Sequence, residues 1–225
     1  MKRILKYTSI LCLFVVSFFI GRQGASFVAS EPIRSSAPCI VIDAGHGAND
    51  PGMIGVNDVY EKDINLAIVL KLAPLLENKG YRVILTRDSD SILADMDSSN
   101  IKREDMKNRL ALIEESNPVI TVSIHQNSFP DSSVCGPQVF FYKDSAESGE
   151  LASCIQNRLD QTLCVSKSRG TKSNVSYYLL KKTPTPTVIV ECGFLSNPDE
   201  AALLCDELYQ EKIVRSIYLG ITDYL

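Results

Sequence analysis

The sequence has few of the residues that form compact metal sites. Only two histidines, His46 and His125, occur in 225 residues, and no two cysteines stand in a CxxC pair. Structural zinc sites usually take four ligands from closely spaced cysteine and histidine pairs, so this spacing argues against one. The HExxH motif, which places two ligands on one helix, is also absent. Any metal site must therefore combine residues that are far apart in the sequence.

Clusters of lysine and arginine are missing as well. Residues 1–30 contain four basic residues and no acids, so the formal net charge of −4 becomes −8 for the remainder of the chain. An acidic body without a basic cluster argues against nucleic acid as a partner and against an electrostatically held anionic surface.

The N-terminal apolar run is too short for an ordinary membrane span. YTSILCLFVVSFFI has 14 residues, whereas a spanning helix needs about 20. The run follows the basic start MKRILK and precedes a tail rich in small residues. This pattern predicts a secretory signal peptide over residues 1–30, with Val28-Ala29-Ser30 as the cleavage signal, and leaves an uncleaved membrane anchor as the alternative. We expect residues 31–38 to be a linker and 39–225 to be an exported domain.

Six cysteines remain after the N-terminal segment, and their even number permits disulfides in an exported protein. A domain of this size does not need disulfides for stability. We therefore predict mostly buried free thiols and at most one bridge. The six are Cys39, Cys135, Cys154, Cys164, Cys192 and Cys205.

Apolar β-branched runs alternate with helical patterns along the rest of the chain. This alternation predicts a single α/β domain with a doubly wound, mostly parallel twisted sheet flanked by helices. Strands are expected at 39–43, 81–86, 119–124, 136–142, 176–181 and 187–190. Helices are expected from about 61 to 80, at 101–116 and 146–163, and once or twice beyond Pro198.

The first predicted helix has recognisable start and stop signals. Asp58 with Glu61 three residues later resembles a capping box, and Gly80 is a typical helix terminator. Pro74 inside the pattern predicts a kink or a broken turn.

Both histidines fall just beyond the end of a predicted strand, and so does one glutamate. His46 follows CIVID, His125 follows VITVSI, and Glu191 follows TVIV. Parallel strands end at one edge of a sheet, which is where ligands bind in such folds. The loop after His46 is long enough to bring Glu61 back to the same edge.

Each of these residues has a simpler explanation when it is taken alone. The alternative is that the histidines are ordinary strand-end residues, Glu61 is a helix-capping acid, and Glu191 is the partner of a lysine. The shared strand-end position favours a joint site, because buried imidazoles and carboxylates need partners. Two histidines and a carboxylate with an open position form a catalytic zinc set, and a further carboxylate can move the proton in amide hydrolysis.

Five motifs then occur in order: IDAGHG, YEKDINLA, LTR, SIHQNSF and VIVECGFLSNPDE. Over about residues 38–224 the sequence resembles the zinc-dependent N-acetylmuramoyl-L-alanine amidases with a type-3 catalytic domain. The resemblance implies one Zn²⁺ ion held by His46, Glu61 and His125, with Glu191 as the catalytic base and acid. It also implies cleavage of peptidoglycan between the muramic acid lactyl group and L-alanine.

The segment NSFPDS followed by GPQVFFY, without wall-binding repeats, is similar to the spore-cortex, germination-specific amidases. This resemblance implies a step that leads to muramic δ-lactam. Together with the N-terminal pattern, it implies a protein that is exported and is then secreted, membrane-anchored or in the intermembrane space of a forming spore. Gln126 and Ala48 depart from the family pattern, and we expect Gln126 to narrow or reshape the cleft.

Other residues are candidates for supporting roles. Asp43 is predicted either to orient a ligand histidine or only to cap the strand-end turn. Asn127 is predicted to shape the turn or to bind substrate. Arg87 and Arg169 are candidates for holding a stem-peptide carboxylate, with solvated ion pairs as the alternative. Cys192 beside Glu191 is expected to be a buried thiol rather than a nucleophile.

Two alternative functions remain at this point. One is a non-catalytic wall-binding or regulatory module, and the other is a zinc peptidase that cuts within the stem peptide. Zinc with only three protein ligands, one of them supplied across a loop, predicts a weakly held ion. We therefore also predict that an activating partner protein orders the site.

Overall fold

The computed structural model describes residues 37–165 and 167–225, in which Pro38–Leu225 form one unit. The predicted signal peptide or anchor, and all but the end of the predicted linker, lie outside the described residues. Among the described helices, none is long and apolar enough to cross a membrane.

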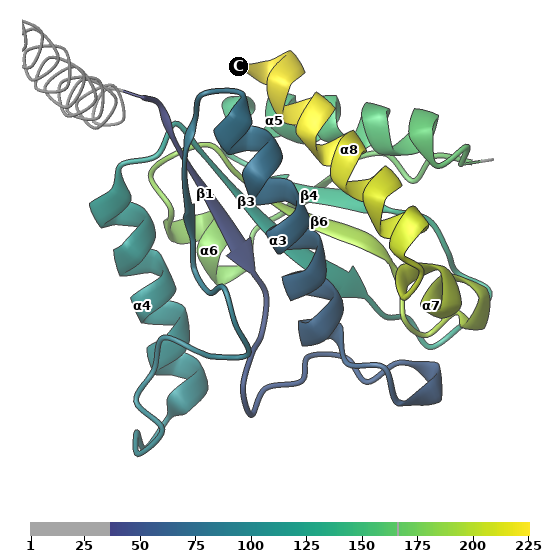
Figure 1. Cartoon of the computed structure of the whole chain (residues 1–225), viewed down its shortest axis with the longest axis horizontal. Coiled ribbons are helices and arrows are strands. Elements are labelled where there is room, and N and C mark those ends of the chain that lie inside the picture. Colours follow the sequence, from purple (N-terminus) through teal and green to yellow (C-terminus); the bar gives the residue numbers. More distant parts are fainter. Residues whose placement is uncertain (1–36, 166) are drawn as a thin grey trace, which may run out of the picture. The chain divides into compact units, whose positions relative to one another are not determined.

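A six-stranded sheet with the order β2-β1-β3-β6-β4-β5 forms the centre of the domain (Figure 1). Strand β1 pairs in parallel with β2 and β3, and β3 pairs in parallel with β6. Strand β4 is antiparallel to β6 and parallel to β5. The predicted fold class, with a mostly parallel sheet, is therefore confirmed. The strands are β1 (Cys39–Ala44), β2 (Arg82–Leu85), β3 (Ile120–Asn127), β4 (Gln138–Tyr142), β5 (Lys172–Asn174) and β6 (Thr187–Phe194).

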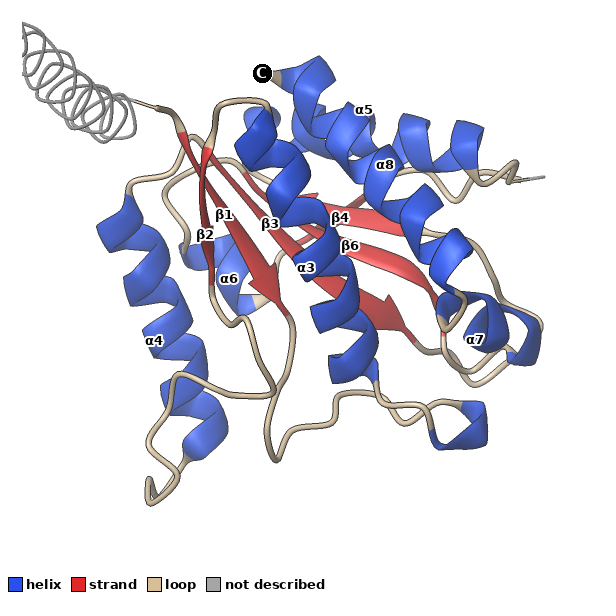
Figure 2. Cartoon of the chain, in the orientation of Figure 1, coloured by secondary structure: helices blue, strands red, loops and turns tan. Residues whose placement is uncertain are grey.

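Helices cover both faces of the sheet (Figure 2). One face packs against α3 (Glu61–Asn78), α5 (Ala146–Thr162) and α8 (Glu207–Tyr224), and this side holds the larger core. The other face packs against α4 (Ile101–Ser116) and α6 (Tyr178–Lys182). Side chains alternate along a strand, so Ile40 and Ile42 belong to the first core and Val41 to the second. A short α7 (Pro198–Leu204) follows β6.

Helix α3 begins differently from the prediction. Asp58 lies in a short 3₁₀ turn, η1 (Val56–Asp58), with φ of 59°, and the N-cap residue of α3 is Tyr60, whose side chain makes no capping hydrogen bond. The capping-box prediction is therefore wrong. Loop carbonyls take over its role, because the Glu61 N–H donates to Met53 O. This leaves the Glu61 side chain available for other contacts.

The predicted stop at Gly80 is confirmed, because α3 ends at Asn78 and Gly80 has φ of 102°. Pro74 does not break the helix, which continues through it. Pro74 and Leu70 both lie on the exposed face. Water can therefore reach the carbonyl that loses its partner at the proline.

The predicted strand over 176–181 is wrong, because most of this segment forms helix α6. The side-chain oxygen of Asn174 accepts hydrogen bonds from the N–H groups of Ser176 and Tyr177, which turns the chain directly before the helix. Leu179 and Leu180, which both lie in this short helix, are buried. The strand that does form here is β5, which the sequence pattern missed.

The cysteines are less buried than predicted. All six are free thiols, but only Cys39 and Cys192 are buried, whereas Cys135, Cys164 and Cys205 are exposed and Cys154 is intermediate. The exposed three lie in loops or at helix ends, where few side chains cover them.

The contact between α5 and α8 gives a stability prediction. A Cβ on Gly220 would lie 2.5 Å from Ile155 Cα, so Gly220→Ala must push the two helices apart. We expect a loss of about 1–3 kcal/mol in the free energy of unfolding, measured by urea denaturation. Gly149→Ala is the matched control, because its Cβ would meet only the edge of the Phe141 ring, at 3.2 Å. Equal stability of the two variants would contradict the proposed close approach.

Candidate metal centre

Three parallel strands bring the candidate residues to one edge of the sheet. His125 and Glu191 are direct neighbours in the β3–β6 register. Asp43 on β1 pairs with Ser123, which lies two residues before His125 on β3. Because alternate residues share a face, Asp43, His125 and Glu191 all belong to the face that α4 and α6 cover.

The loop after β1 needs glycine on both sides of His46. A Cβ on Gly45 would lie 2.3 Å from the His125 ring, so only glycine lets the two histidines approach. His46 itself has φ of 65°, and Gly47 has φ of 143°. The backbone therefore turns sharply here. The His46 and His125 rings meet edge to face, with centroids 5.0 Å apart.

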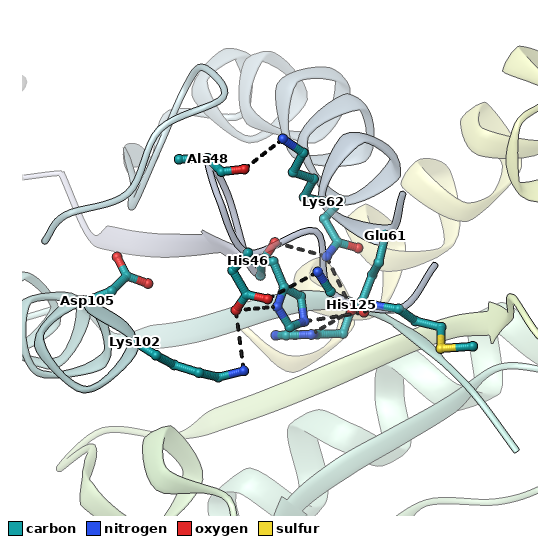
Figure 3. A network of polar contacts seen from close by, with 12 residues as sticks. His46, Ala48, Glu61, Lys62, Lys102, Asp105 and His125 are labelled. Carbon is teal, nitrogen blue, oxygen red and sulfur yellow. Dashed lines mark hydrogen bonds and ion pairs between the residues drawn. The ribbon is translucent and has the colours of Figure 1, made fainter. Parts of the chain in front are cut away.

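The Glu61 carboxylate lies between the two histidines (Figure 3). Its Oε1 is 2.9 Å from His125 Nδ1 and its Oε2 is 3.3 Å from His46 Nε2. The same two oxygens accept hydrogen bonds from the N–H groups of Gln126 and Met53. The loop and β3 thus fix the carboxylate in a single orientation.

The three predicted ligands fit a metal ion. One ligand atom from each of His46, Glu61 and His125 lies within 4.8 Å of the others. Burial raises the pKa of Glu61, but its contacts with His125 and His46 lower it well below its usual range. Burial lowers the pKa of His125, but Glu61 raises it to about 9. The Glu61 carboxylate is therefore ionised, and it stabilises positive charge beside it.

Glu191 lines the same cavity, of about 300 Å³, as the three candidate ligands. Its side chain is buried, with 8% of the residue exposed, and its Oε2 has no hydrogen-bond partner among the described residues. Burial raises the pKa of Glu191 to about 7, with a further upward contribution from Glu61 and opposing ones from the histidines. Near neutral pH such a carboxyl group can both accept and release a proton.

His46 has a partner that the sequence prediction missed. Its Nδ1 is 3.0 Å from Asp50 Oδ2, and Lys102 from α4 lies 3.4 Å from the same oxygen. Asp43, the residue predicted to orient a histidine, instead accepts hydrogen bonds from Thr86, Arg109 and Ser123. The only signal for Asp50 was its position four residues after His46 in a loop rich in acids and amides.

Two buried arginines hold the His46 loop through its carbonyl groups. Arg109, which the sequence did not single out, is 2% exposed and donates to Ala44 O at 2.7 Å and His46 O at 2.8 Å. Arg87 donates to Ala44 O, Gly45 O and Lys62 O. Its guanidinium group is thus committed to the main chain. Through Lys62 O it also ties the loop to the first turn of α3, next to Glu61.

Asn127 and Arg169 do not line this cavity. The Asn127 side chain accepts a hydrogen bond from the Ser128 N–H, while Arg169 lies over the Phe194 ring at 4.9 Å. Gln126 does line the cavity, and its amide donates to Asn65. Burial raises the pKa of the Cys192 thiol far above its usual range, as expected for an unreactive buried thiol.

Fold and centre together define a class of α/β enzyme with two histidines and a carboxylate grouped beside a second, buried carboxyl group. The family model described as N-acetylmuramoyl-L-alanine amidase, Amidase_3, matches residues 40–223. The chain belongs to this family, and it is therefore a peptidoglycan amidase.

Individual relatives agree with this assignment. The chain is 35% identical to the germination-specific N-acetylmuramoyl-L-alanine amidase of Bacillus subtilis, over 100% of this chain and 96% of the relative. It is similar to the CwlD amidase from Clostridioides difficile, solved in complex with the GerS lipoprotein, with a TM-score of 0.81 and 45% identity over 83% of this chain and 98% of that one. The catalytic domain of CwlV from Bacillus (Paenibacillus) polymyxa gives a TM-score of 0.74 at 32% identity, over 83% of this chain and 97% of that one.

The buried pair of Asp43 and Arg109 gives a pH prediction. Burial raises the pKa of Asp43, but Arg109 and Ser123 lower it, to about 2, below its usual 3.8. The contribution of the charged form to stability is therefore present above about pH 4 and is lost as the pH falls toward 2. We expect Asp43→Asn to lower the free energy of unfolding by about 3 kcal/mol at pH 6, and by progressively less below pH 4.

Urea denaturation of wild type and variant at several pH values measures this difference. Asp223→Asn is the matched control, because it removes an exposed ion pair with Arg158. It should cost at most about 1 kcal/mol. A constant difference for Asp43→Asn from pH 6 to pH 2 would show that Asp43 does not titrate in this range.

Proposed function

We propose that this amidase is a zinc enzyme that removes stem peptides from peptidoglycan, with His46, Glu61 and His125 as the metal ligands and Glu191 as the proton carrier. The observation that carries the proposal is the convergence of three ligand atoms within 4.8 Å in the cavity that Glu191 also lines. Two histidines, one carboxylate and an open position are the usual ligand set of a catalytic zinc ion. Zinc dependence is also general in the amidase family to which the chain belongs.

A zinc ion held there would polarise the lactyl carbonyl of the substrate and lower the pKa of a water molecule. Glu61, fixed by five contacts, and His46, oriented by Asp50, would supply preset ligand atoms. The free Oε2 of Glu191 accepts the proton of the attacking water and returns it to the alanine nitrogen, which leaves as an amine.

We further propose that the substrate is the peptidoglycan of the spore cortex, and that peptide removal precedes formation of muramic δ-lactam. The full-length similarity to a germination-specific amidase supports this role. The N-terminal sequence pattern supports export. The product would be a muramic acid with a free lactyl carboxylate, which a later ring-closing reaction requires.

We propose in addition that an accessory protein assists this enzyme. The similar CwlD amidase was solved in complex with the GerS lipoprotein, which supports a partner of this kind. An exported partner could stabilise the loop between β1 and α3, which carries His46 and Asp50.

Digestion of purified cortex peptidoglycan, followed by mass spectrometry, tests the function and the role of Glu191 together. The wild-type protein should release peptides with N-terminal alanine and leave the glycan intact. Glu191→Gln should lower kcat by about 10²–10⁴-fold, because the amide cannot carry the proton, while zinc affinity stays near the wild-type value. Cys192→Ala is the matched control at the adjacent buried position.

Three outcomes would contradict the proposal. Peptide fragments without N-terminal alanine would indicate a peptidase, and binding to the wall without any cleavage would indicate a non-catalytic module. Wild-type rates for Glu191→Gln would exclude Glu191 as the proton carrier.

The contact between Asp50 and His46 predicts an effect on metal binding. Replacing Asp50 by asparagine keeps the shape but removes the charge that fixes the His46 ring, and such partners typically contribute 10–100-fold in affinity. We expect a loss of about tenfold in zinc affinity, measured by competition with a chromophoric chelator. Asp90→Asn, which alters an ion pair with Lys62 outside the cavity, is the control. Equal affinities for the two variants would remove Asp50 from the site.

A further inference from the structure

A second cavity adjoins the proposed zinc centre. It has a volume of about 250 Å³ and is lined by Asn49, Asp50, Ile92, Ile101, Lys102 and Asp105. Three of these residues, Asp50, Lys102 and Asp105, also line the cavity that holds the ligand residues. The cleft therefore continues past the proposed metal site, along the first turns of α4. The proposed mechanism makes no use of this extension.

The two acids at the junction already have fixed partners. The Asp105 carboxylate accepts from Arg109 Nε and from the Leu93 N–H, both at 2.7 Å. Asp50 accepts from His46 and from the Gly52 N–H. Neither carboxylate is therefore free to leave its position when a ligand enters.

Lys102 is the exposed charged side chain at this junction. Its side chain is 74% exposed, and its ammonium group reaches toward the His46 side of the centre from α4 (Figure 3). The ion pair with Asp50, at 3.4 Å, is of the exposed kind that contributes little to stability. Arg109, the arginine of the cleft lining, is 2% exposed and bound to Asp43, Asp105 and two carbonyl groups. Of the lysine and arginine in the described lining, Lys102 is thus the one that can meet an anion from solvent.

The proposed substrate carries such an anion close to the scissile bond. Its stem peptide begins with L-alanine, and the D-glutamate that follows is linked through its side chain, which leaves its α-carboxylate free. A residue of extended chain spans at most about 3.6 Å. Lys102 Nζ lies 3.4 Å from Asp50 Oδ2, and the same oxygen lies 3.0 Å from His46 Nδ1. A stem peptide that runs from the proposed metal site toward the second cavity therefore brings the carboxylate of its second residue within reach of Lys102.

We propose that Lys102 and the second cavity bind the stem peptide, with the lysine exchanging Asp50 for a peptide carboxylate and Ile92 and Ile101 contacting the aliphatic chain beyond it. This inference rests on the peptidoglycan amidase function proposed above. It makes Lys102 a determinant of substrate specificity, because an amidated stem peptide would present no anion. The carboxylate is that of D-glutamate or of the diamino acid in the third position, and the experiment separates the two.

The test compares kcat and KM on three soluble muropeptides: one with all stem carboxylates free, one amidated at D-glutamate, and one amidated at the third residue. We expect Lys102→Met to raise KM for the free substrate about fivefold, the upper range for an exposed ion pair, with little change in kcat. Its effect should vanish on the substrate whose amidation removes the bound carboxylate, and that substrate identifies the carboxylate. Lys102→Arg should retain the preference.

Lys107→Met, on an exposed position of α4 outside both cavities, is the matched control and should behave as the wild type. Zinc affinity of Lys102→Met should also equal that of the wild type, which separates a substrate contact from an effect through Asp50. An equal effect on all three substrates, or none on any, would overturn the proposal. A wild-type protein that cleaves none of the three when loaded with zinc would instead contradict the proposed function.

Discussion

The parallel register of β1, β3 and β6 is the constraint on which the centre depends. In this register the three strands end at one edge of the sheet. Because side chains alternate along each strand, Asp43, His125 and Glu191 lie on the same face. A slip of one residue in β3 would move His125 into the larger core and Ile124 into the cleft. The apolar residues at alternate positions prevent this slip, because they are buried only in the observed register. Core packing and site geometry are therefore set by the same pairing.

Much of this arrangement could be predicted from the sequence. Long apolar runs predicted the central strands, and the shared strand-end position of the only two histidines indicated where they would meet. Glu61 was predicted to belong to the site because it follows the His46 loop at the start of a predicted helix. Its predicted capping partner was wrong, since loop carbonyls satisfy the first N–H groups of α3.

Other features could not be predicted, for physical reasons. Arg109 lies in a helix rich in charged residues, where an arginine ordinarily faces water, and only the tertiary fold shows that Asp43 and Asp105 bury it. Asp50 is one of several acids and amides in a loop without periodicity. The segment that forms α6 has the β-favouring residues of a strand, but the turn at Asn174 and the burial of two leucines outweigh that preference.

The five contacts to the Glu61 carboxylate, which include a hydrogen bond from the Asn65 amide, bear on whether the protein folds before or after it binds a metal ion. A zinc finger acquires its shape only when the ion arrives, because the ion replaces a missing core. Here an extensive core and the main-chain donors of Met53 and Gln126 already orient the carboxylate. Such a chain can fold before a metal ion binds to it. Under the proposed zinc mechanism, the supply of the ion, rather than the supply of folded protein, would then decide when the enzyme becomes active.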